Sequence, residues 1–281
     1  MTMVSVSTII CCVITLLICL LLPVLVLLLF ANKCKKQGII PAWLLGAAGF
    51  FVTQILIRVP ILAVLQNKEW FVNFSRNSPF LYVFSLAFTA GLFELAGRFA
   101  VAKVMQKDLT FRRSLAAGLG HGGIEAIIIV GLTYVNNLLY IFMINTGIFE
   151  TLYTQPGITE PIITQLEMIR TQLTTYPAPM FLLGALERIL AMTCHTAMSM
   201  LVCYGIAHKK VTVCTIACLA IHTLLDLTAG ISLLAGNGLS QTAVYIIIYT
   251  ILTLAAVASL VIIRELVRRW NKPEVSYDSQ V

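Results

Sequence analysis

The sequence predicts an all-α, polytopic membrane protein with about seven transmembrane helices, its N-terminus outside and its C-terminus inside. Of its 281 residues, 59% are hydrophobic and only 11% are charged, and the mean hydropathy is +0.93. A soluble domain carries about 25% charged residues. Seven apolar runs are each long enough to cross about 30 Å of hydrocarbon, which takes roughly 20 helical residues. The lysines and arginines gather in alternate loops between these runs, as the positive-inside rule requires.

The expected spans cover residues 4–30, 39–65, 79–105, 114–140, 178–207, 211–235 and 241–265. We expect one integral-membrane domain over residues 1–281, multi-pass in the cell membrane. Its motif-bearing core is 79–230, an outer loop with an amphipathic helix covers 146–177, and a cytoplasmic tail covers 266–281.

The loop charges give the orientation. The inside loops would hold Lys33, Lys35, Lys36, Lys107, Arg112, Arg113, Lys209, Lys210, Arg264, Arg268, Arg269 and Lys272, whereas the outside loops hold only Lys68, Arg76 and Arg170. The first run has its positive charges after it, which indicates a retained anchor and not a cleaved signal peptide. Because the net charge of +7 is spread over these short loops, it reflects topology, and we expect no nucleic-acid partner.

The eight cysteines predict no disulfide framework, since none falls in an expected outer loop. Buried cysteine usually behaves as a small hydrophobe. Cys214 and Cys218 continue the helical face of His222 and Asp226, so a thiol–imidazole metal site is conceivable. It ranks low because no CxxC spacing is present.

The first two spans are mainly packing elements. Pro23 is a candidate kink in the first. Arg58 in the second has three open interpretations: it extends to the membrane surface, pairs with a carboxylate, or binds a lipid headgroup.

The third and fourth spans carry the first ionisable pairs. Glu94 and Arg98 are four residues apart and can pair within one helix, either to fix packing or to orient a catalytic carboxylate. His121 and Glu125 are also four apart, in the run Gly118-Leu119-Gly120-His121-Gly122-Gly123-Ile124-Glu125. The glycines of this run allow another backbone to approach closely. Ionisable groups at membrane depth are costly and indicate a functional site by default.

The long outer loop contains a predicted helix. Thr159 and Pro161 are typical of a helix start, and apolar residues then recur at helical spacing at Ile162, Ile163, Leu166, Ile169 and Leu173. This amphipathic stretch is either a connector resting on the bilayer or a lid over a site.

The fifth and sixth spans add further ionisable groups. The fifth has Glu187, Arg188 and His195, with Arg188 and His195 nearly two turns apart on one face. The sixth has His222 and Asp226, another pair four apart. The seventh has no ionisable residue before Arg264 and is expected to be structural.

The ionisable residues also share a depth. At 1.5 Å per residue from the inside end of each helix, Glu94 lies at roughly 16 Å, His121 at roughly 11 Å, Glu125 and His222 at roughly 17 Å and His195 at roughly 18 Å. Scattered packing residues have no reason to share a layer, whereas a common polar cavity gives them one. We therefore predict a shared site.

These motifs resemble those of a known family. Phe93-Glu94-Leu95-Ala96-Gly97-Arg98, Gly120-His121-Gly122-Gly123-Ile124-Glu125-Ala126, Glu187-Arg188 with His195, and His222 with Asp226 are similar to the motif series of the YhfC family of intramembrane peptidases. The family more distantly resembles the CAAX-protease/Abi and PrsW membrane peptidases. Relatives often have paired glutamates where this sequence has Glu94 and Leu95.

The resemblance implies hydrolysis of peptide bonds in membrane-associated protein or peptide substrates. In a version without metal, Glu94 or Glu125 activates water, His195 and His222 stabilise the oxyanion, Asp226 orients His222 and Arg98 keeps Glu94 charged. In a metal version, two or three of His121, His195 and His222 bind zinc and a carboxylate is the base. No HExxH motif is present, so spacing alone does not establish a metal.

Two other classes of function remain open at this point. The same polar set could form a proton or metal relay in a transporter, although no inverted repeat or broken helix pair is evident. The other is a catalytically inactive membrane scaffold that binds partner helices, an interpretation that Leu95 in place of a second acid keeps open.

Overall fold

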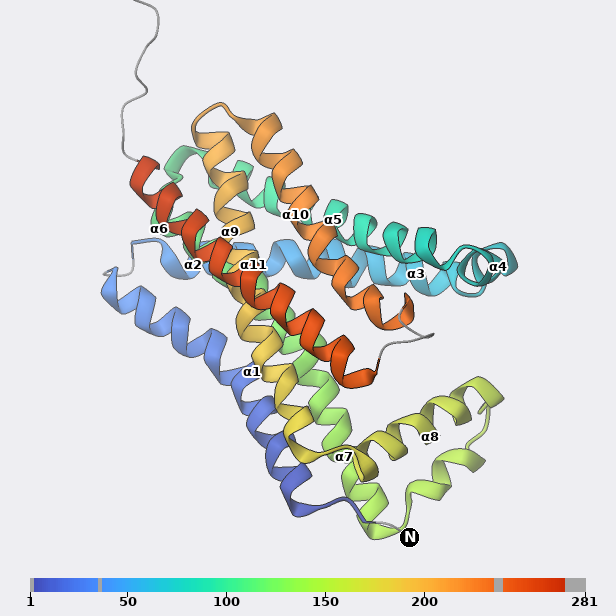
Figure 1. Ribbon diagram of the computed structural model, residues 1–281. Coiled ribbons are helices and arrows are strands. Elements are labelled where there is room, and N and C mark those ends of the chain that lie inside the picture. The colour runs from blue at the N-terminus through green and yellow to red at the C-terminus, as the bar shows by residue number, and fades with distance from the viewer. Residues whose placement is uncertain (1–2, 35–36, 235–239, 271–281) are drawn as a thin grey trace, which may run out of the picture. The chain divides into compact units, whose positions relative to one another are not determined.

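The computed structural model describes residues 3–34, 37–234 and 240–270, and within them all regular structure is helical (Figure 1). Seven helical stretches are long and apolar enough to cross a membrane: Val6–Lys33, Ile39–Leu65, Pro79–Val104, Phe111–Thr146, Ala178–Ala207, Val211–Thr228 and Gln241–Trp270. The predicted fold class and all seven spans are confirmed. The fourth and seventh run several residues beyond their predicted ends.

Large apolar side chains cover the outside of these stretches. Leu21, Ile246 and Leu254 are 59%, 62% and 64% exposed, values that lipid contact explains and water contact does not. The predicted orientation of the termini stays a prediction. Lys35, Lys36, Lys272 and residues 271–281 of the predicted tail lie outside the described residues; the tail's first residues, 266–270, are the end of a helix.

The chain divides into two compact units. One comprises Met1–Val26 and Glu125–Ile189, and the other comprises Leu27–Ile124 and Leu190–Val281. Each is described by itself, and the expectation of one domain stays a prediction.

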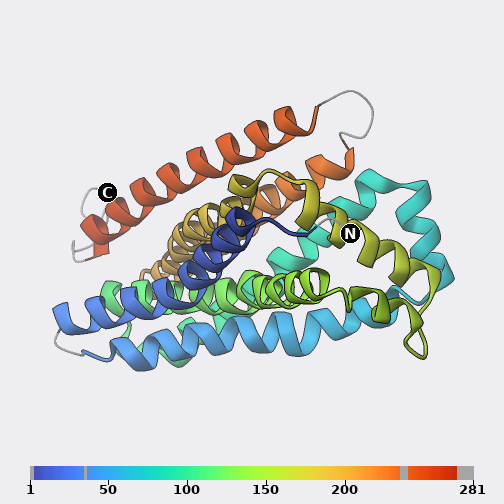
Figure 2. The ribbon, with the colours of Figure 1, turned by 90° about the horizontal axis from the view of Figure 1, so that it is seen from below.

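The first unit contains most of α1 (Val6–Lys33), η3 (Ala126–Gly131), α7 (Leu132–Thr146), η4 (Phe149–Thr154), α8 (Glu160–Thr175), η5 (Ala178–Leu182) and the start of α9 (Leu183–Ala207). Its core includes Ile141, Phe149, Leu166 and Leu173. The amphipathic helix is therefore present as α8, packed against α7 (Figures 1 and 2). It begins after Thr159 as predicted, although that side chain makes no capping bond. The lid role stays a prediction.

The second unit is built around α5 (Pro79–Val104). The helix α10 (Val211–Leu234) packs along it, as do α2 (Ile39–Phe50) and the π-helix η1 (Phe51–Arg58), and α11 (Gln241–Trp270) packs on α10 (Figures 1 and 2). The unit also holds α3 (Val59–Leu65), α4 (Glu69–Asn77), η2 (Gln106–Asp108), α6 (Phe111–Glu125) and most of α9.

The glycines of α6 bring three helices close together, as predicted. A Cβ at Gly120 would lie 1.9 Å from the carbonyl oxygen of Trp43 in α2, and one at Gly118 would lie 2.7 Å from the Cα of Thr196 in α9. Both positions therefore require glycine. This close approach carries His121, the residue after Gly120, into the middle of the unit, where it is 1% exposed.

Candidate metal centre

The carboxylate of Glu94 is the centre of a buried polar group. Glu94 is 4% exposed on α5, and its Oε1 accepts a hydrogen bond of 2.7 Å from Gln54 Nε2. Its Oε2 accepts one of 2.9 Å from Arg98 Nη2 and lies 2.9 Å from His121 Nε2 and 2.8 Å from His222 Nε2. Four side chains, one each from η1, α5, α6 and α10, thus meet at one carboxylate.

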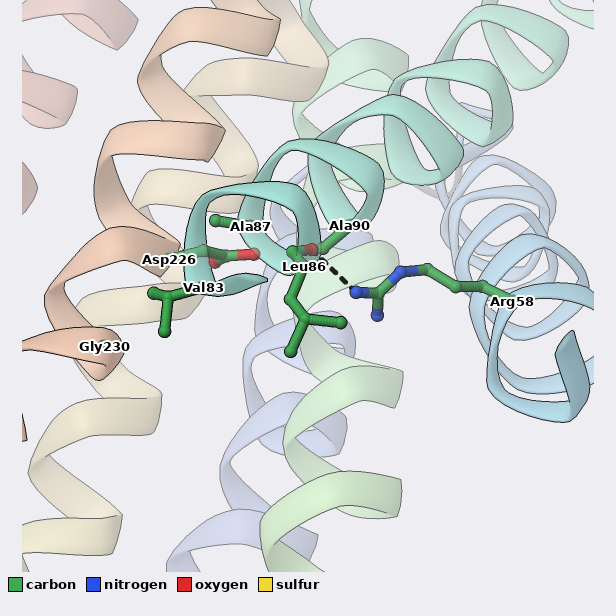
Figure 3. Close-up of a pocket in the computed structure, with 7 residues that line it drawn as sticks. All are labelled: Arg58, Val83, Leu86, Ala87, Ala90, Asp226 and Gly230. Atoms are coloured by element: carbon green, nitrogen blue, oxygen red, sulfur yellow. Dashed lines mark hydrogen bonds between the residues drawn. The ribbon is translucent and has the colours of Figure 1, made fainter. Parts of the chain in front are cut away.

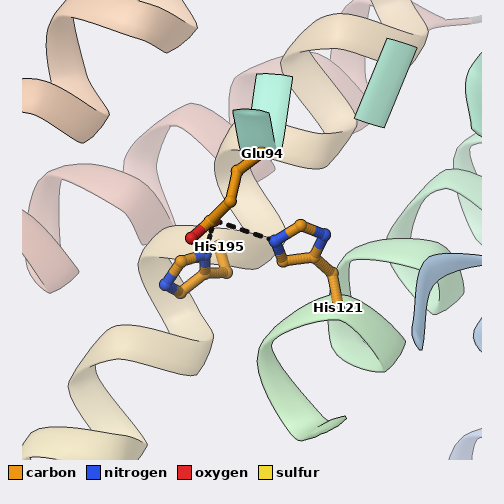
Figure 4. Close-up of side chains that lie close together, drawn as sticks. All are labelled: Glu94, His121 and His195. Carbon is orange, nitrogen blue, oxygen red and sulfur yellow. Dashed lines mark hydrogen bonds and ion pairs between the residues drawn. The ribbon is translucent and has the colours of Figure 1, made fainter. Parts of the chain in front are cut away.

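The third imidazole, His195 of α9, completes the group. Its Nδ1 lies 2.6 Å from Arg98 Nη2 and 3.5 Å from Glu94 Oε2. The rings of His121 and His195 are stacked with centroids 5.4 Å apart, and both point toward Glu94 (Figure 4). The convergence expected from the shared depth of Glu94, His121, His195 and His222 is therefore present.

Two predicted pairs hold this group in place. Arg98 lies one turn after Glu94 on α5 and forms the ion pair that the spacing predicts. Asp226 lies one turn after His222 on α10, with its Oδ2 3.4 Å from His222 Nδ1. A carboxylate beyond an imidazole fixes which ring nitrogen faces the site.

Sequence reasoning missed Gln54. It is 5% exposed on η1, and its amide donates to both Glu94 Oε1 and, at 3.4 Å, the carbonyl oxygen of Ala90. Its Oε1 accepts from Arg58 Nη1 at 3.4 Å. The signal available was the spacing of Gln54 and Arg58, two polar residues four apart in an otherwise apolar run.

The donor atoms suit a metal ion. Glu94, His121 and His195 are all buried and offer one ligand atom each, all within 4.8 Å of one another. Two imidazoles and one carboxylate are a set that catalytic zinc uses, with a further position open for water. Arg98 donates to two of these ligand atoms, so the guanidinium and a cation would compete for them. The identity of the metal is a proposal, as is the predicted role of His222 as a ligand.

Glu125, Glu187 and Arg188 form an ion-paired group in the first unit. Arg188 Nη1 donates to Glu125 Oε1 at 2.9 Å, and its Nη2 donates to Glu187. Arg188 is 8% exposed, so this is a buried ion pair with a second carboxylate beside it. A catalytic role for these three residues stays a prediction.

Comparison with known proteins identifies the family of the chain. The sequence profile of the YhfC intramembrane metalloprotease family matches residues 18–262. This chain belongs to the YhfC family. A relative, the "Uncharacterized membrane protein YhfC" of Bacillus subtilis, is 32% identical over 180 residues, which cover 63% of this chain and 68% of the relative. No solved structure matches the chain.

Membership of the YhfC family confirms the resemblance and the multi-pass membrane location. The matched residues include every ionisable residue of the Glu94 group. The family's description as intramembrane metalloproteases agrees with a membrane protease that has a metal site. The more distant likeness to CAAX-protease/Abi and PrsW peptidases stays a prediction.

Proposed function

We propose that this protein is an intramembrane metallopeptidase that hydrolyses peptide bonds in membrane-embedded protein or peptide substrates, with zinc held by Glu94, His121 and His195. The observation that carries the proposal is the buried Glu94 carboxylate, which lies 2.9 Å from His121 and 3.5 Å from His195 inside a membrane-spanning unit. Burying these groups together is costly unless they bind a ligand or one another.

The reaction adds water to a carbonyl carbon and breaks the bond to nitrogen. A zinc ion held by Glu94, His121 and His195 would supply water activated for attack and would polarise the scissile carbonyl. His222 lies 2.8 Å from the same Glu94 oxygen, outside the three proposed ligands, and Asp226 orients it. We assign it to proton transfer: it receives the proton from water and delivers it to the leaving nitrogen.

Arg98 and Gln54 have positioning roles in this scheme. Arg98 compensates the charge of Glu94 and also donates to His195 Nδ1, so it links two of the proposed ligands. Gln54 donates a hydrogen bond to Glu94 Oε1, and Oε2 is left directed at the imidazoles. Groups that orient metal ligands typically alter affinity or activity by 10–100-fold when they are removed.

The test compares variants of three of the chain's four histidines. Purified full-length protein in proteoliposomes with zinc is given a transmembrane reporter peptide, and products are identified by mass spectrometry. We expect cleavage by the wild type and by His208→Ala, and loss of cleavage by His121→Ala and His195→Ala. His208 is the matched control because it stacks on Tyr204, with centroids 4.2 Å apart, and not on the Glu94 group. Equal cleavage by all four proteins would rule the site out.

A further inference from the structure

A cavity of about 280 Å³ lies beside the Glu94 group in the second unit. Arg58 and Asp226 supply its charged walls, and Val83, Leu86, Ala87 and Gly230 supply apolar ones (Figure 3). Ligand pockets usually measure about 300–1,000 Å³, so this one is small. A helix with its side chains is about 10–12 Å across. The cavity therefore suits a short piece of extended chain and not a folded helix.

The cavity adjoins the proposed catalytic group at two points. Asp226 Oδ2 lies 3.4 Å from His222 Nδ1, and the Nε2 of the same imidazole lies 2.8 Å from Glu94 Oε2. Ala90, which also lines the cavity, precedes Glu94 by four residues on α5, an axial rise of about 6 Å. A ligand in the cavity would therefore lie next to the reacting atoms.

Both charged walls keep bonding capacity for a ligand. Arg58 lines the cavity and is half-buried; it donates from Nη2 to the carbonyl oxygen of Leu86 at 2.7 Å and from Nη1 to Gln54 Oε1 at 3.4 Å. A guanidinium has five N–H donors and a carboxylate about four acceptor positions. Asp226, with its side chain 37% exposed, directs Oδ2 toward His222 and leaves other positions for a ligand. The two side chains extend toward each other across the cavity (Figure 3).

Opposite charges in one small cavity restrict the ligand. An anion is attracted by Arg58 and repelled by Asp226, whereas a cation is attracted by Asp226 and repelled by Arg58. A peptide group offers a carbonyl oxygen to Arg58 and an N–H to Asp226, so it satisfies both. In a helix these groups are already bonded to one another. Only an unwound segment has them free, and unsatisfied backbone groups are costly within a membrane.

We propose that this cavity binds an unwound stretch of substrate backbone, in which the Arg58 guanidinium donates to a carbonyl oxygen and the Asp226 carboxylate accepts an amide N–H. The proposal rests on the proposed peptidase function and names its substrate class: transmembrane helices that unwind easily beside the scissile bond. Arg58 and Asp226 replace the hydrogen bonds that the substrate helix loses.

The test measures binding without requiring cleavage. The probes are two fluorescent peptides of about 20 apolar residues, alike except for Gly-Gly or Leu-Leu at the centre. Their affinity for the full-length protein in lipid nanodiscs is measured in the presence of a chelator. We expect the wild type to prefer the Gly-Gly peptide, and Arg58→Met to bind it about tenfold to a hundredfold more weakly, as loss of hydrogen bonds to a charged group implies.

A second pair of variants tests the cavity itself. Ala87→Leu places a larger side chain in the cavity and keeps both charges, so we expect the same loss of binding. Ala100→Leu is the matched control on the exposed side of the same helix, and it should bind as the wild type does. Thermal unfolding shows which variants are folded. If only one of Arg58→Met and Ala87→Leu folds, that variant alone tests whether peptide binding requires the cavity.

Two results distinguish this proposal from the peptidase function. Wild-type affinity in Arg58→Met and in Ala87→Leu overturns the backbone site, whether or not the zinc-loaded protein cleaves the peptide. Binding of the Gly-Gly peptide that depends on Arg58, without cleavage by the zinc-loaded wild type, supports the backbone site and overturns the peptidase function.

Discussion

Neutralising Glu94 should destabilise the protein strongly, because its carboxylate compensates a buried guanidinium. Glu94 and Arg98 are 4% and 3% exposed, and their ion pair is 2.9 Å long. In Glu94→Gln the amide keeps the size of the side chain but leaves the charge of Arg98 unpaired. Breaking a buried pair in this way costs about 3–5 kcal/mol.

Glu94→Gln also replaces one hydrogen-bond acceptor of the side chain with a donor. The carboxylate accepts from Gln54 and Arg98 and faces His121 and His222, whereas an amide has one acceptor oxygen and an NH₂ that donates. At least one donor therefore loses its acceptor, which adds about 1–3 kcal/mol. The unpaired charge and the lost hydrogen bond both follow from changing the same carboxylate, so their free-energy costs do not simply add. We expect a total loss of unfolding free energy near the upper end of the range of about 3–5 kcal/mol given for the broken ion pair, that is about 5 kcal/mol.

The assay is reversible unfolding of the purified protein in mixed micelles, with a chelator present so that metal binding does not contribute. The control Glu167→Gln, on the exposed side of α8, should change the free energy of unfolding by less than about 0.5 kcal/mol. The double variant Glu94→Gln with Arg98→Met removes both charges and should recover most of the loss. A loss of unfolding free energy below about 1 kcal/mol for Glu94→Gln, or no recovery of stability in the double variant, would show that Glu94 does not compensate the buried charge of Arg98.

Three further predictions follow from single contacts. Gln54→Leu should lower zinc affinity about tenfold in a competition titration, because it releases the second carboxylate oxygen; unchanged affinity would remove its positioning role. Gly120→Ala should lower the free energy of unfolding by about 1–3 kcal/mol or more, since its Cβ would lie 1.9 Å from the backbone of Trp43, whereas Gly91→Ala, 3.2 Å from a flexible side-chain end, should be nearly neutral. Arg188→Met should cost about 3–5 kcal/mol in the same unfolding assay because it leaves Glu125 without the buried arginine of its ion pair; a neutral effect would contradict that structural role.

The transmembrane architecture could be predicted from the sequence because lipid imposes it. Each span needs a long apolar run, and these runs are visible without any tertiary information. The glycines around His121 likewise predicted close helix packing, since that is the main reason to place several glycines in one membrane helix. The side of the membrane on which each terminus lies depends on charge alone and stays a prediction.

The site could be predicted only in part, because depth along a helix does not give direction around it. Glu94, His195 and His222 share a depth and meet. Glu125 shares that depth too and forms an ion pair with Arg188 in the first unit, so its predicted catalytic role stays a prediction. Packing decides which face of one helix contacts which face of another. A single sequence does not show these contacts.

Gln54 was missed for a different reason. A neutral amide in an apolar run has no catalytic signature, and Gln54 lies in the π-helix from Phe51 to Arg58. An extra residue in one helical turn rotates the following side chains, and local sequence does not predict where this occurs. Such π-helical turns are frequent at functional sites.

The most direct test of the account is the metal content of the purified protein. The test uses three full-length proteins: the wild type, His195→Ala and His208→Ala. Each is loaded with zinc and freed of excess metal by gel filtration, and its zinc content is measured by inductively coupled plasma mass spectrometry. We expect equimolar zinc in the wild type and in His208→Ala, and little in His195→Ala, because His195 is one of the three proposed buried ligands. Zinc-free wild type, or undiminished zinc in His195→Ala, would contradict it.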